Sequence, residues 1–579
     1  MNELFNPVQR LDRTVVTRIT KQECDSQKGE NISYSEIPDV VPNPVNEKKF
    51  IFDGYVPKKD LINFIINQRK IEIPENVEYI SDFMLKQIPF WHRIQGMTIA
   101  LCTGTGTGKT TFIRELAKFT GEKILLLTNR VTNRKQVEHY VNCEGGLNNL
   151  DIMNYQSLKT ISGSISYINR YSYLVADEAH YYLSDSSFNP DTNIHFQSIM
   201  NATFPIKIFM TATSERIVPQ ILEKMLRDAK WNQMLVMQKF LQYECINRKS
   251  NIRKIVAFSQ LASLYFEIEN SDFQWMVYVK NVAQGNEIKK DLLKRGITVD
   301  FLCRESIDDE MSEEEKNILN NLIKTKSFSS KVLVTTILLD NGVDVVMPSL
   351  KAMAILLWDS VELVQIIGRK RCHSSNDWFD IYLYEEDYRT LKATICNRMG
   401  KKNQLNQTEK MLNSGVFDPR WIKPGKEYDV ERYKVFWNDI QSRIKFNHLY
   451  KIETTDEINE LYKYLEYDHP IDYKVEIIRK KFACVPQVVY AKEQDAKVFL
   501  LDLVPFSNCY FLRKDKEKIL DFRKVFTRNK IKFFGKDSVH ERSGRPYSMK
   551  KIKQVCSELN LPINITEDPK GYLINIEKC

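Results

Sequence analysis

The sequence predicts an α/β protein in which two tandem parallel-sheet domains are followed by a mixed α+β region of basic character. Short continuous apolar runs alternate with longer amphipathic stretches in two successive series along the chain. Such runs are typical of strands buried on both faces, and the alternation is typical of a parallel sheet with helices on either side. The alternation stops near residue 395, where a more charged region begins.

The first series gives a domain over residues 85–235. The expected strands are 97–101 (MTIAL), 123–128 (KILLLT), 151–154, 173–176 (YLVA) and 206–211 (IKIFMT), with helices over 110–119 and 130–141. Residues 1–84 form a leader and helical extension: the first fifty are polar and contain several prolines, and amphipathic helices are expected from Lys58 and over 77–88.

The second series gives a domain over residues 236–395. Its expected strands are 274–279 (QWMVYV), 299–302, 331–335 (KVLVT), 352–357 (AMAILL) and 379–384 (FDIYLY). This domain lacks a glycine-lysine loop of its own. Two similar domains that share one such loop place a nucleotide at their interface, where the second domain can contribute residues.

Size and composition set the class of protein. At 579 residues and 68.1 kDa the chain exceeds a single hydrophobic core. It contains no run of about 18 apolar residues, and its N-terminal sequence MNELFNPVQRLDR lacks the apolar segment of a signal peptide. Its eleven cysteines include no CxxC pair, which argues against a disulfide framework and a structural zinc site. We therefore expect a cytoplasmic protein with reduced thiols and no membrane contact.

Positive charge is concentrated in the C-terminal region, residues 396–579. Between residues 511 and 555 there are fifteen Lys and Arg against five Asp and Glu, a balance of +10 in a chain whose net charge is +9. Aromatic residues interleave these charges, which favours a nucleic-acid-binding surface over a solvated helical face, although the rings can equally be core. The terminal helix, strand, turn and strand are compatible with a winged-helix-like fold or with another accessory domain.

A glycine-rich loop follows the first expected strand. The sequence TGTGTGKTT runs from Thr103 to Thr111 and opens the next expected helix. Its glycines let backbone N–H groups curl around phosphates, the lysine reaches the β and γ phosphates, and the first threonine of the helix can ligate magnesium. The candidate nucleotide-binding residues are Gly104, Thr105, Gly106, Thr107, Gly108, Lys109, Thr110 and Thr111, of which Thr110 is also a candidate magnesium ligand.

Two acidic residues follow the strand YLVA. Asp177 emerges at the carboxyl end of that strand and can hold Mg²⁺, and the adjacent Glu178 is placed to orient and deprotonate an attacking water. Acidic strand ends are often merely solvated. The combination with Lys109, 68 positions earlier, instead indicates hydrolysis of a nucleoside triphosphate.

The chain resembles superfamily 2 helicases of the DEAD/DEAH-box type, and a bacterial or phage-type member in particular. The resemblance covers roughly residues 95–375 and rests on segments that occur in the family's order. They are TGTGKT (105–110), LLLTNR (125–130), NYQSL (154–158), DEAH (177–180), TAT (211–213), WMVYVKN (275–281), TTILLDNGVD (335–344) and QIIGRKR (365–371). The family has two tandem RecA-like domains, binds ATP with Mg²⁺ and acts on nucleic acid.

The resemblance implies roles for further residues. Arg369 and Arg371 would act as arginine fingers on the γ-phosphoryl group, and Gln365 with His180 would link the water-activating site to the closing interface. Gly342 and Asp344 would approach the ribose. The residues that would meet the nucleic-acid backbone are Arg130, Gln156 and Thr336.

The last segment departs from the family pattern. The family often has QxxGRxGR, whereas this chain has Arg371-Cys372 at the end, so the second finger is either displaced by one residue or absent, and which arginine acts stays open. Neither Gln87 nor Gln95 has the context of an adenine-recognising glutamine, so ATP is expected by analogy and use of other nucleotides stays open.

The sequence therefore predicts an ATP-dependent helicase or translocase that moves on or unwinds nucleic acid, DNA in preference to RNA. Two alternatives stay open. One is a remodeller that strips proteins from DNA without separating its strands. The other is a regulatory switch for which nucleic acid is a ligand rather than a track.

Overall fold

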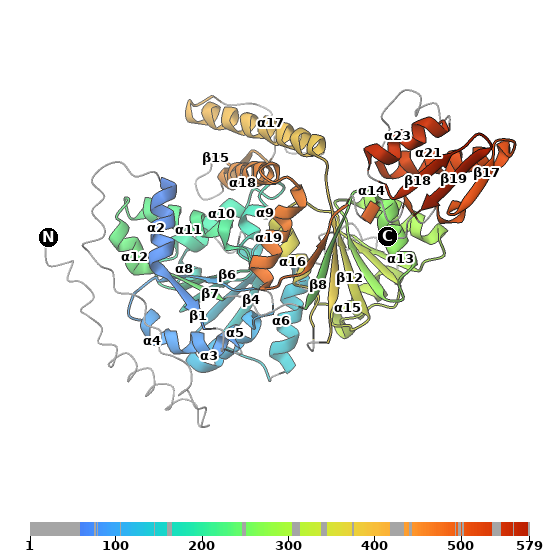
Figure 1. The fold of residues 1–579 in the computed structure, drawn as a ribbon. Helices are drawn as coiled ribbons and strands as arrows, with labels where there is room; N and C mark the ends of the chain where they lie inside the picture. The colour runs from blue at the N-terminus through green and yellow to red at the C-terminus, as the bar shows by residue number, and fades with distance from the viewer. Residues whose placement is uncertain are drawn as a thin grey trace.

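Two seven-stranded parallel sheets form the body of the molecule (Figure 1). The computed structural model describes residues 58–576 apart from 75–76, 78, 105, 144, 159–164, 246–250, 304–312, 337–343, 373–375, 417–432, 439–442, 492–493, 496–498, 501–502, 535–545 and 560. Of the predicted leader and helical extension over residues 1–84, residues 1–57 lie outside the described residues. None of the described helices is long and apolar enough to cross a membrane.

The first sheet has the order β1-β7-β2-β6-β5-β3-β4. Its strands are β1 (Lys70–Ile73), β2 (Thr98–Cys102), β3 (Ile124–Thr128), β4 (Leu150–Asn154), β5 (Tyr173–Ala176), β6 (Ile206–Thr211) and β7 (Phe240–Cys245). The helical segments of this part are α2 (Lys58–Arg69), α3 (Ile80–Met84), η4 (Leu85–Gln87), α4 (Ile88–Trp91), α5 (Lys109–Thr120), α6 (Val131–Cys143), α8 (Ile165–Ile168), α9 (Tyr181–Ser184), α10 (Thr192–Asn201), α11 (Ser214–Asp228) and α12 (Gln233–Lys239).

The second sheet has the order β10-β11-β9-β12-β13-β8-β16. Its strands are β8 (Ile252–Phe258), β9 (Gln274–Tyr278), β10 (Val299–Leu302), β11 (Val332–Thr335), β12 (Leu350–Ile355), β13 (Phe379–Tyr384) and β16 (Gln487–Val489). The helices that follow its strands are α13 (Leu261–Glu269), α14 (Val282–Lys294), α15 (Glu313–Thr325) and α16 (Ser360–Ile367).

Each sheet is covered on both faces, as the continuous apolar strands predicted. Along β3, Ile124 and Leu126 belong to one apolar cluster, whereas Leu125 and Leu127 belong to another on the opposite face. The second sheet likewise lies between two clusters. The chain therefore has the predicted α/β fold with two tandem RecA-like domains and a mixed α+β C-terminal region.

Four strands of the two large sheets were not among those predicted from the sequence. β1 and β7, on either side of residues 85–235 in the chain, together form one edge of the first sheet, and β8 and β16 form one edge of the second. β16 comes from the C-terminal region and pairs with β8 through Gln487 to Val489. All four lie at or next to a sheet edge, and the outermost strands, β1 and β16, are too short for their apolar sequence to mark them.

The C-terminal region first crosses both domains. Its elements are α17 (Tyr388–Asn413), the antiparallel pair β14 (Val435–Asn438) and β15 (Arg443–Phe446), α18 (His448–Leu465) and α19 (Pro470–Phe482). In Figure 1, α17 and α18 lie along one side of the first domain. The C-terminal module contains η8 (Val504–Phe506), β17 (Cys509–Leu512), α21 (Lys516–Phe534), α23 (Met549–Glu558), β18 (Ile563–Glu567) and β19 (Gly571–Ile576).

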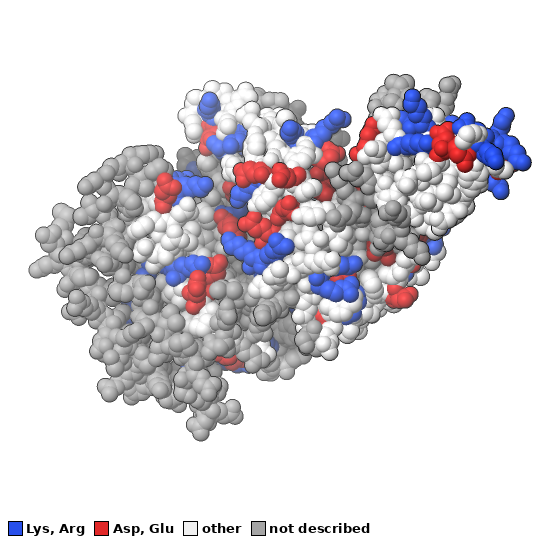
Figure 2. Space-filling view, in the orientation of Figure 1, with Lys and Arg blue, Asp and Glu red and all other residues white. Residues whose placement is uncertain are grey.

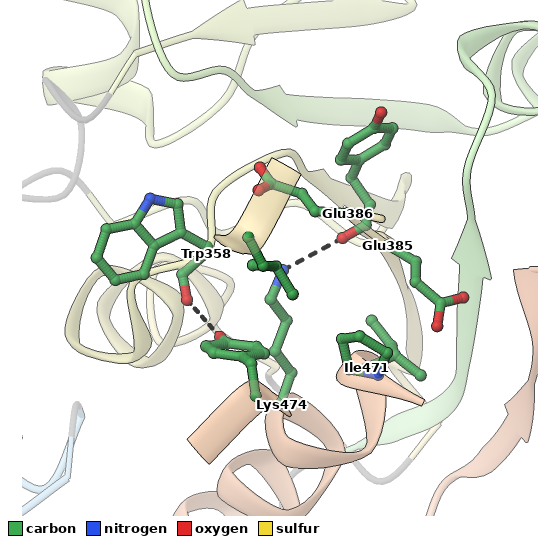
Figure 3. A pocket seen from close by; sticks show the side chains of 9 residues that line it. Trp358, Glu385, Glu386, Ile471 and Lys474 are labelled. Carbon is green, nitrogen blue, oxygen red and sulfur yellow. Dashed lines mark hydrogen bonds between the residues drawn. The ribbon is translucent and has the colours of Figure 1, made fainter. Parts of the chain in front are cut away.

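A small pocket marks where α19 joins the second sheet (Figure 3). Lys474 of α19 is buried and donates to the carbonyl oxygens of Leu357 and Tyr384, 2.7 and 3.2 Å away, just beyond β12 and at the end of β13. The Tyr464 hydroxyl of α18 donates to the Trp358 carbonyl beside it. Burial lowers the pKa of Lys474 to about 7, so these carbonyls hold an amine that is only partly charged at neutral pH.

Candidate functional site

The glycine loop links β2, near the centre of the first sheet, to α5. Gly106 and Gly108 have φ values of 78° and 90°, in the left-handed region that favours glycine. Thr107 Oγ1 donates to Gly104 O at 3.0 Å, and Lys109 Nζ donates to Thr103 O at 3.2 Å, so the loop curls around its own lysine. The loop therefore has the strand-loop-helix context predicted for it; Thr105 lies outside the described residues.

The two acidic residues lie at the same edge of the sheet as this loop. β5 and β2 both pair with β6 in parallel, so their carboxyl ends share one edge. Asp177 is buried, and its carboxylate accepts hydrogen bonds from Asn133 Nδ2 at 3.3 Å and from the backbone N–H of Glu178 at 3.0 Å. Asn133, on α6, was not singled out from the sequence, because an amide on a helix face carries no motif.

Glu178 has a strained backbone. Its φ of 49° is left-handed, which costs a residue with a Cβ roughly 1–2 kcal/mol. Its carboxylate oxygen Oε2 is buried and accepts no hydrogen bond from the described residues. Strain of this kind persists where the surrounding structure enforces it, often at functional sites.

The surroundings of Asp177 and Glu178 shift the pKa values of the two carboxyl groups in opposite directions. Burial and the neighbouring Glu178 raise the pKa of Asp177, and Lys109 opposes them in part. Burial alone would also raise the pKa of Glu178, but Lys109, His180, Arg369 and Arg371 outweigh it and lower the pKa. The positive side chains thus favour an ionised Glu178.

The donor set fits magnesium held together with a nucleotide. Thr110 in the first turn of α5 and Asp177 offer a hydroxyl and a carboxylate, the hard oxygen ligands that Mg²⁺ prefers. Across the described residues, no three His, Cys, Asp or Glu side chains gather as a metal cluster. Mg²⁺ commonly takes one or two protein oxygens and completes its coordination with phosphates and water, so this sparse set suffices.

The second domain reaches this site through α16. Gln365 Nε2 lies 2.8 Å from His180 Nε2, although the two residues are 185 positions apart. An amide NH₂ only donates, so His180 Nε2 accepts and the neutral ring carries its proton on Nδ1, which lies 3.5 Å from Glu178 Oε2. Burial lowers the pKa of His180 to about 4, so the ring is neutral at pH 7.

Two arginines of the second domain face the loop. An isolated bridge joins Val345 to Lys370, with Val345 N donating to Arg369 O at 2.8 Å and Arg371 N donating to Val345 O at 2.9 Å. Arg369 and Arg371 both approach Asp344, whereas the ammonium of Lys370 donates to Asp377. The Arg371 guanidinium covers Gly106: its Cζ is 3.1 Å from where a Cβ would stand.

Asp344 joins the two arginines. Its Oδ1 lies 3.0 Å from Arg371 Nη2 and 3.8 Å from Arg369 Nη1. The Asp344 carboxylate is therefore paired with the two guanidinium groups and does not point freely toward the ribose of a nucleotide. Gly342, the other residue expected near the ribose, lies outside the described residues.

A tyrosine stands beside the loop without having been predicted. Tyr79, 46% exposed, precedes α3, and its Cδ1 is 3.4 Å from where a Cβ on Gly108 would stand. The next residue, Ile80, donates its backbone N–H to Thr107 O at 3.4 Å. Of the two glutamines considered for this position, Gln87 is buried and Gln95 is exposed.

The three predicted nucleic-acid contacts follow the carboxyl ends of strands. Arg130 follows β3, exposed Gln156 follows the neighbouring β4, and Thr336 follows β11 of the second sheet. Arg130 forms a bidentate pair with Asp185, with nitrogen–oxygen distances of 2.9 and 3.2 Å. A nucleic-acid phosphate that binds Arg130 would therefore displace the Asp185 carboxylate from the guanidinium or share the guanidinium with it.

Comparison with known proteins gives only weak structural likenesses. No protein-family model matches the chain, and no curated protein matches its sequence. Similar solved structures include a DEAD box protein from the hyperthermophile Methanococcus jannaschii, at 17% identity and a TM-score of 0.30, covering 51% of this chain and 83% of that one. Another is S. cerevisiae Dbp5 bound to RNA and ADP BeF3, at 14% identity and 0.32, covering 58% and 84%.

A third similar structure is a fragment of a putative HsdR subunit of a type I restriction enzyme from Vibrio vulnificus YJ016. It has 15% identity and a TM-score of 0.34, over 52% of this chain and 62% of that chain. The fold assignment therefore rests on the strand order and burial of the chain itself.

Proposed function

We propose that this protein is an ATP-driven motor of the superfamily 2 type that moves along or unwinds nucleic acid, DNA rather than RNA. The observation that carries the proposal is the contact between His180 of the first domain and Gln365 of the second, beside Glu178. A site whose halves come from two domains couples hydrolysis to their relative movement.

In the proposed reaction the loop binds the triphosphate and Lys109 neutralises its β and γ phosphates. Mg²⁺ held by Thr110 and Asp177 would withdraw charge from the same phosphates. Ionised Glu178 orients the attacking water and accepts its proton as the water oxygen bonds to the γ-phosphorus and the bond from that phosphorus to the β–γ bridging oxygen breaks, which releases ADP. Gln365 holds neutral His180 in the tautomer whose proton is on Nδ1, the ring nitrogen that lies 3.5 Å from Glu178 Oε2.

Arg371 is our candidate for the arginine finger. Its guanidinium already covers the loop at Gly106, on the side of the phosphates, whereas Arg369 is more buried behind it. The displacement from the family pattern by one residue is accommodated because Arg371, like Arg369, approaches Asp344 and its guanidinium still reaches Gly106. Developing charge on the γ-phosphoryl group would then be stabilised only when the domains are closed.

Hydrolysis measurements test the proposal. ATP turnover is measured alone and with single-stranded DNA, duplex DNA and single-stranded RNA, for the wild type, Lys109→Ala and Glu178→Gln. We expect nucleic acid to stimulate the wild type, and we expect both variants to lose turnover, with Glu178→Gln still binding ATP because the loop is intact. A wild-type rate that no nucleic acid changes would contradict the motor proposal.

A strand-displacement assay separates unwinding from remodelling. A labelled strand annealed to a longer partner is released by a helicase in the presence of ATP. A remodeller hydrolyses ATP on the same substrate without releasing the strand. A regulatory switch would hydrolyse ATP slowly, and none of the nucleic acids tested would sustain repeated turnover.

A further inference from the structure

The C-terminal module has a defined three-stranded topology. β17 comes first in sequence, the helices α21 and α23 follow, and the hairpin β18–β19 closes the module. The sheet order is β17-β19-β18, and both pairings are antiparallel. The order of β17, α21, α23 and the hairpin, with β19 in the middle of the sheet, matches that of a winged helix, and residues 535–545 between the two helices lie outside the described residues.

The aromatic residues of the basic segment form the core of this module. Phe522 and Phe526 of α21 are fully buried, and Tyr547 just before α23 is nearly so. They pack in one cluster with Ile552 of α23 and Ile574 of β19. These rings cannot stack on bases, so the sequence-based argument from interleaved aromatic residues does not hold for them; the side chains of Phe533 and Phe534 lie outside the description.

The outer face of α23 is basic in its first turn, and the exposed acidic Glu558 lies at its other end, where it accepts a hydrogen bond from Gln554. Met549, Ile552, Val555 and Cys556 are turned into the core. Lys550 is exposed and Lys551 partly exposed, and the exposed Gln554 and Ser557 continue the Lys550 stripe at helical spacing. No ion pair involving Lys550 or Lys551 occurs among the described residues, whereas many other lysines of the chain are paired.

The hairpin lies beside this face. Lys553 of α23 pairs with Glu567 at the end of β18, with a nitrogen–oxygen distance of 2.9 Å, and Arg513 pairs with the same carboxylate at 2.8 Å. Lys570 is exposed in the turn that follows. Figure 2 shows Lys and Arg side chains gathered along the outer edge of the module, with a few acidic side chains between them.

We propose that α23 and the β18–β19 turn bind duplex DNA, with α23 in the major groove and Lys550, Lys551 and Lys570 on its phosphates. The B-form major groove, about 12 Å wide, admits an α-helix of about 10–12 Å diameter. The A-form RNA major groove is too deep and narrow for this. The inference rests on the proposed motor function and adds its substrate class.

The module moves with the second domain. Asp495, just before it, accepts hydrogen bonds from Ser259 and Ser263 beside and within α13, and Phe266 of α13 packs against the module's core. Duplex bound by α23 is therefore tied to the domain that carries the arginines. Each closure of the two domains would shift that duplex relative to the glycine loop.

Binding measurements on the full chain test the site. Fluorescence anisotropy is recorded with a labelled mixed-sequence duplex DNA, one of its single strands, and an RNA duplex of the same sequence, over a series of salt concentrations. The variant Lys550→Glu/Lys551→Glu is compared with Lys524→Glu/Arg528→Glu, which makes the same change of charge on exposed residues of α21 turned away from Phe522 and Phe526.

We expect the α23 variant to bind duplex DNA about tenfold more weakly. The salt dependence of its binding should fall by the equivalent of about two phosphate contacts. The α21 variant should bind nearly as the wild type does. Equal losses in both variants, unchanged duplex affinity, or RNA duplex bound as tightly as DNA would overturn the proposal. Lys109→Ala removes hydrolysis and leaves α23 intact. Its duplex binding is therefore a test of the α23 site alone, and it separates failure of this site from failure of the proposed motor function.

Discussion

Three consecutive residues of the second domain have different surroundings. Lys370 is buried, and its ammonium donates to Asp377 and to the Met347 carbonyl, whereas Arg369 and Arg371 approach Asp344 and Arg371 covers Gly106. The isolated bridge at Lys370 fixes the backbone on which this division depends. A basic cluster in the sequence therefore contains both a core residue and the candidate finger.

Arg371→Ala should lower kcat for ATP on the order of a thousandfold, as loss of an arginine finger does. Its melting temperature should stay close to the wild-type value, because the side chain is partly exposed. Lys370→Ala is the matched neighbour: it leaves the buried Asp377 with fewer partners and should lower the melting temperature instead. A thousandfold loss for Arg369→Ala with an active Arg371→Ala would transfer the role to Arg369.

Tyr79 gives a second prediction for a single residue. Its exposed ring beside Gly108 can stack on the base of a nucleotide held by the loop, and such stacking contributes about 1–3 kcal/mol per base. Tyr79→Ala should raise KM for ATP about tenfold with kcat little changed, and Tyr79→Phe should restore the wild-type KM. Steady-state kinetics decide this, since equal KM values in all three proteins would exclude stacking.

At the scale of one element, α18 connects the two domains. Arg216 of α11 pairs with Glu453 and Glu460 of α18 and with Asp359, the N-cap of α16, which carries Gln365. Glu460 also accepts the backbone N–H of Ser360 at 2.7 Å, at the start of α16. One helix of the C-terminal region thereby holds the first domain against the helix that completes the site.

This cluster has three carboxyl groups for one guanidinium, which makes its stability dependent on pH. Burial raises the pKa of Glu453 to about 8 from an ordinary value of 4.5, despite the opposing effect of Arg216, and burial also raises the pKa of Glu460 to about 7. A raised pKa favours the protonated form in the folded state. The contribution of protonated Glu453 to the free energy of unfolding is therefore fully present below pH 4.5 and is lost as the pH rises through about 8.

Glu453→Gln keeps a neutral polar group at this position at every pH. The melting temperature of the variant should exceed that of the wild type by a margin that widens from pH 4.5 to about 8 and then stays constant. Each 1 kcal/mol of the difference corresponds to about 2–4 °C. Glu466→Gln, at the exposed end of α18, is the control, and a margin independent of pH would contradict the prediction.

At the scale of the whole molecule, the chain leaves the second domain and returns to it. After β13 it crosses both domains through α17 and α18, and then α19 and β16 pack back onto the second sheet. Ile471, Val475 and Ile478 of α19 are buried in that domain's core. The C-terminal region is thus partly structural, whereas the module from about residue 499 onward has an apolar core of its own.

Two truncations test this division. Removal of residues 496–579 keeps α19 and β16 and should preserve cooperative unfolding and basal ATP hydrolysis while weakening duplex binding, most clearly at low salt. Removal of residues 471–579 exposes the apolar surface that α19 covers and should unfold the second domain. Circular dichroism and ATPase rates distinguish them, and equal stability of both products would contradict a structural role for α19.

Much of the fold was predictable because its signals are local. The composition of continuous apolar strands such as 124–128 and 173–176 by itself predicts that they are buried on both faces. β1 and β16, of four and three residues, are strands only because a neighbour pairs with them. Tyr79 and Asn133 could not be found from the sequence for a similar reason, since neither belongs to a spaced pattern.

By itself the sequence determined the α/β class, the glycine loop and the acidic pair, because each depends on residues that are adjacent in the chain. Only the tertiary structure decided which arginine covers Gly106, that the rings of the basic segment are core, and that α18 ties Arg216 to α16. These facts depend on contacts between residues tens to hundreds of positions apart, and such contacts exist only after the chain has packed.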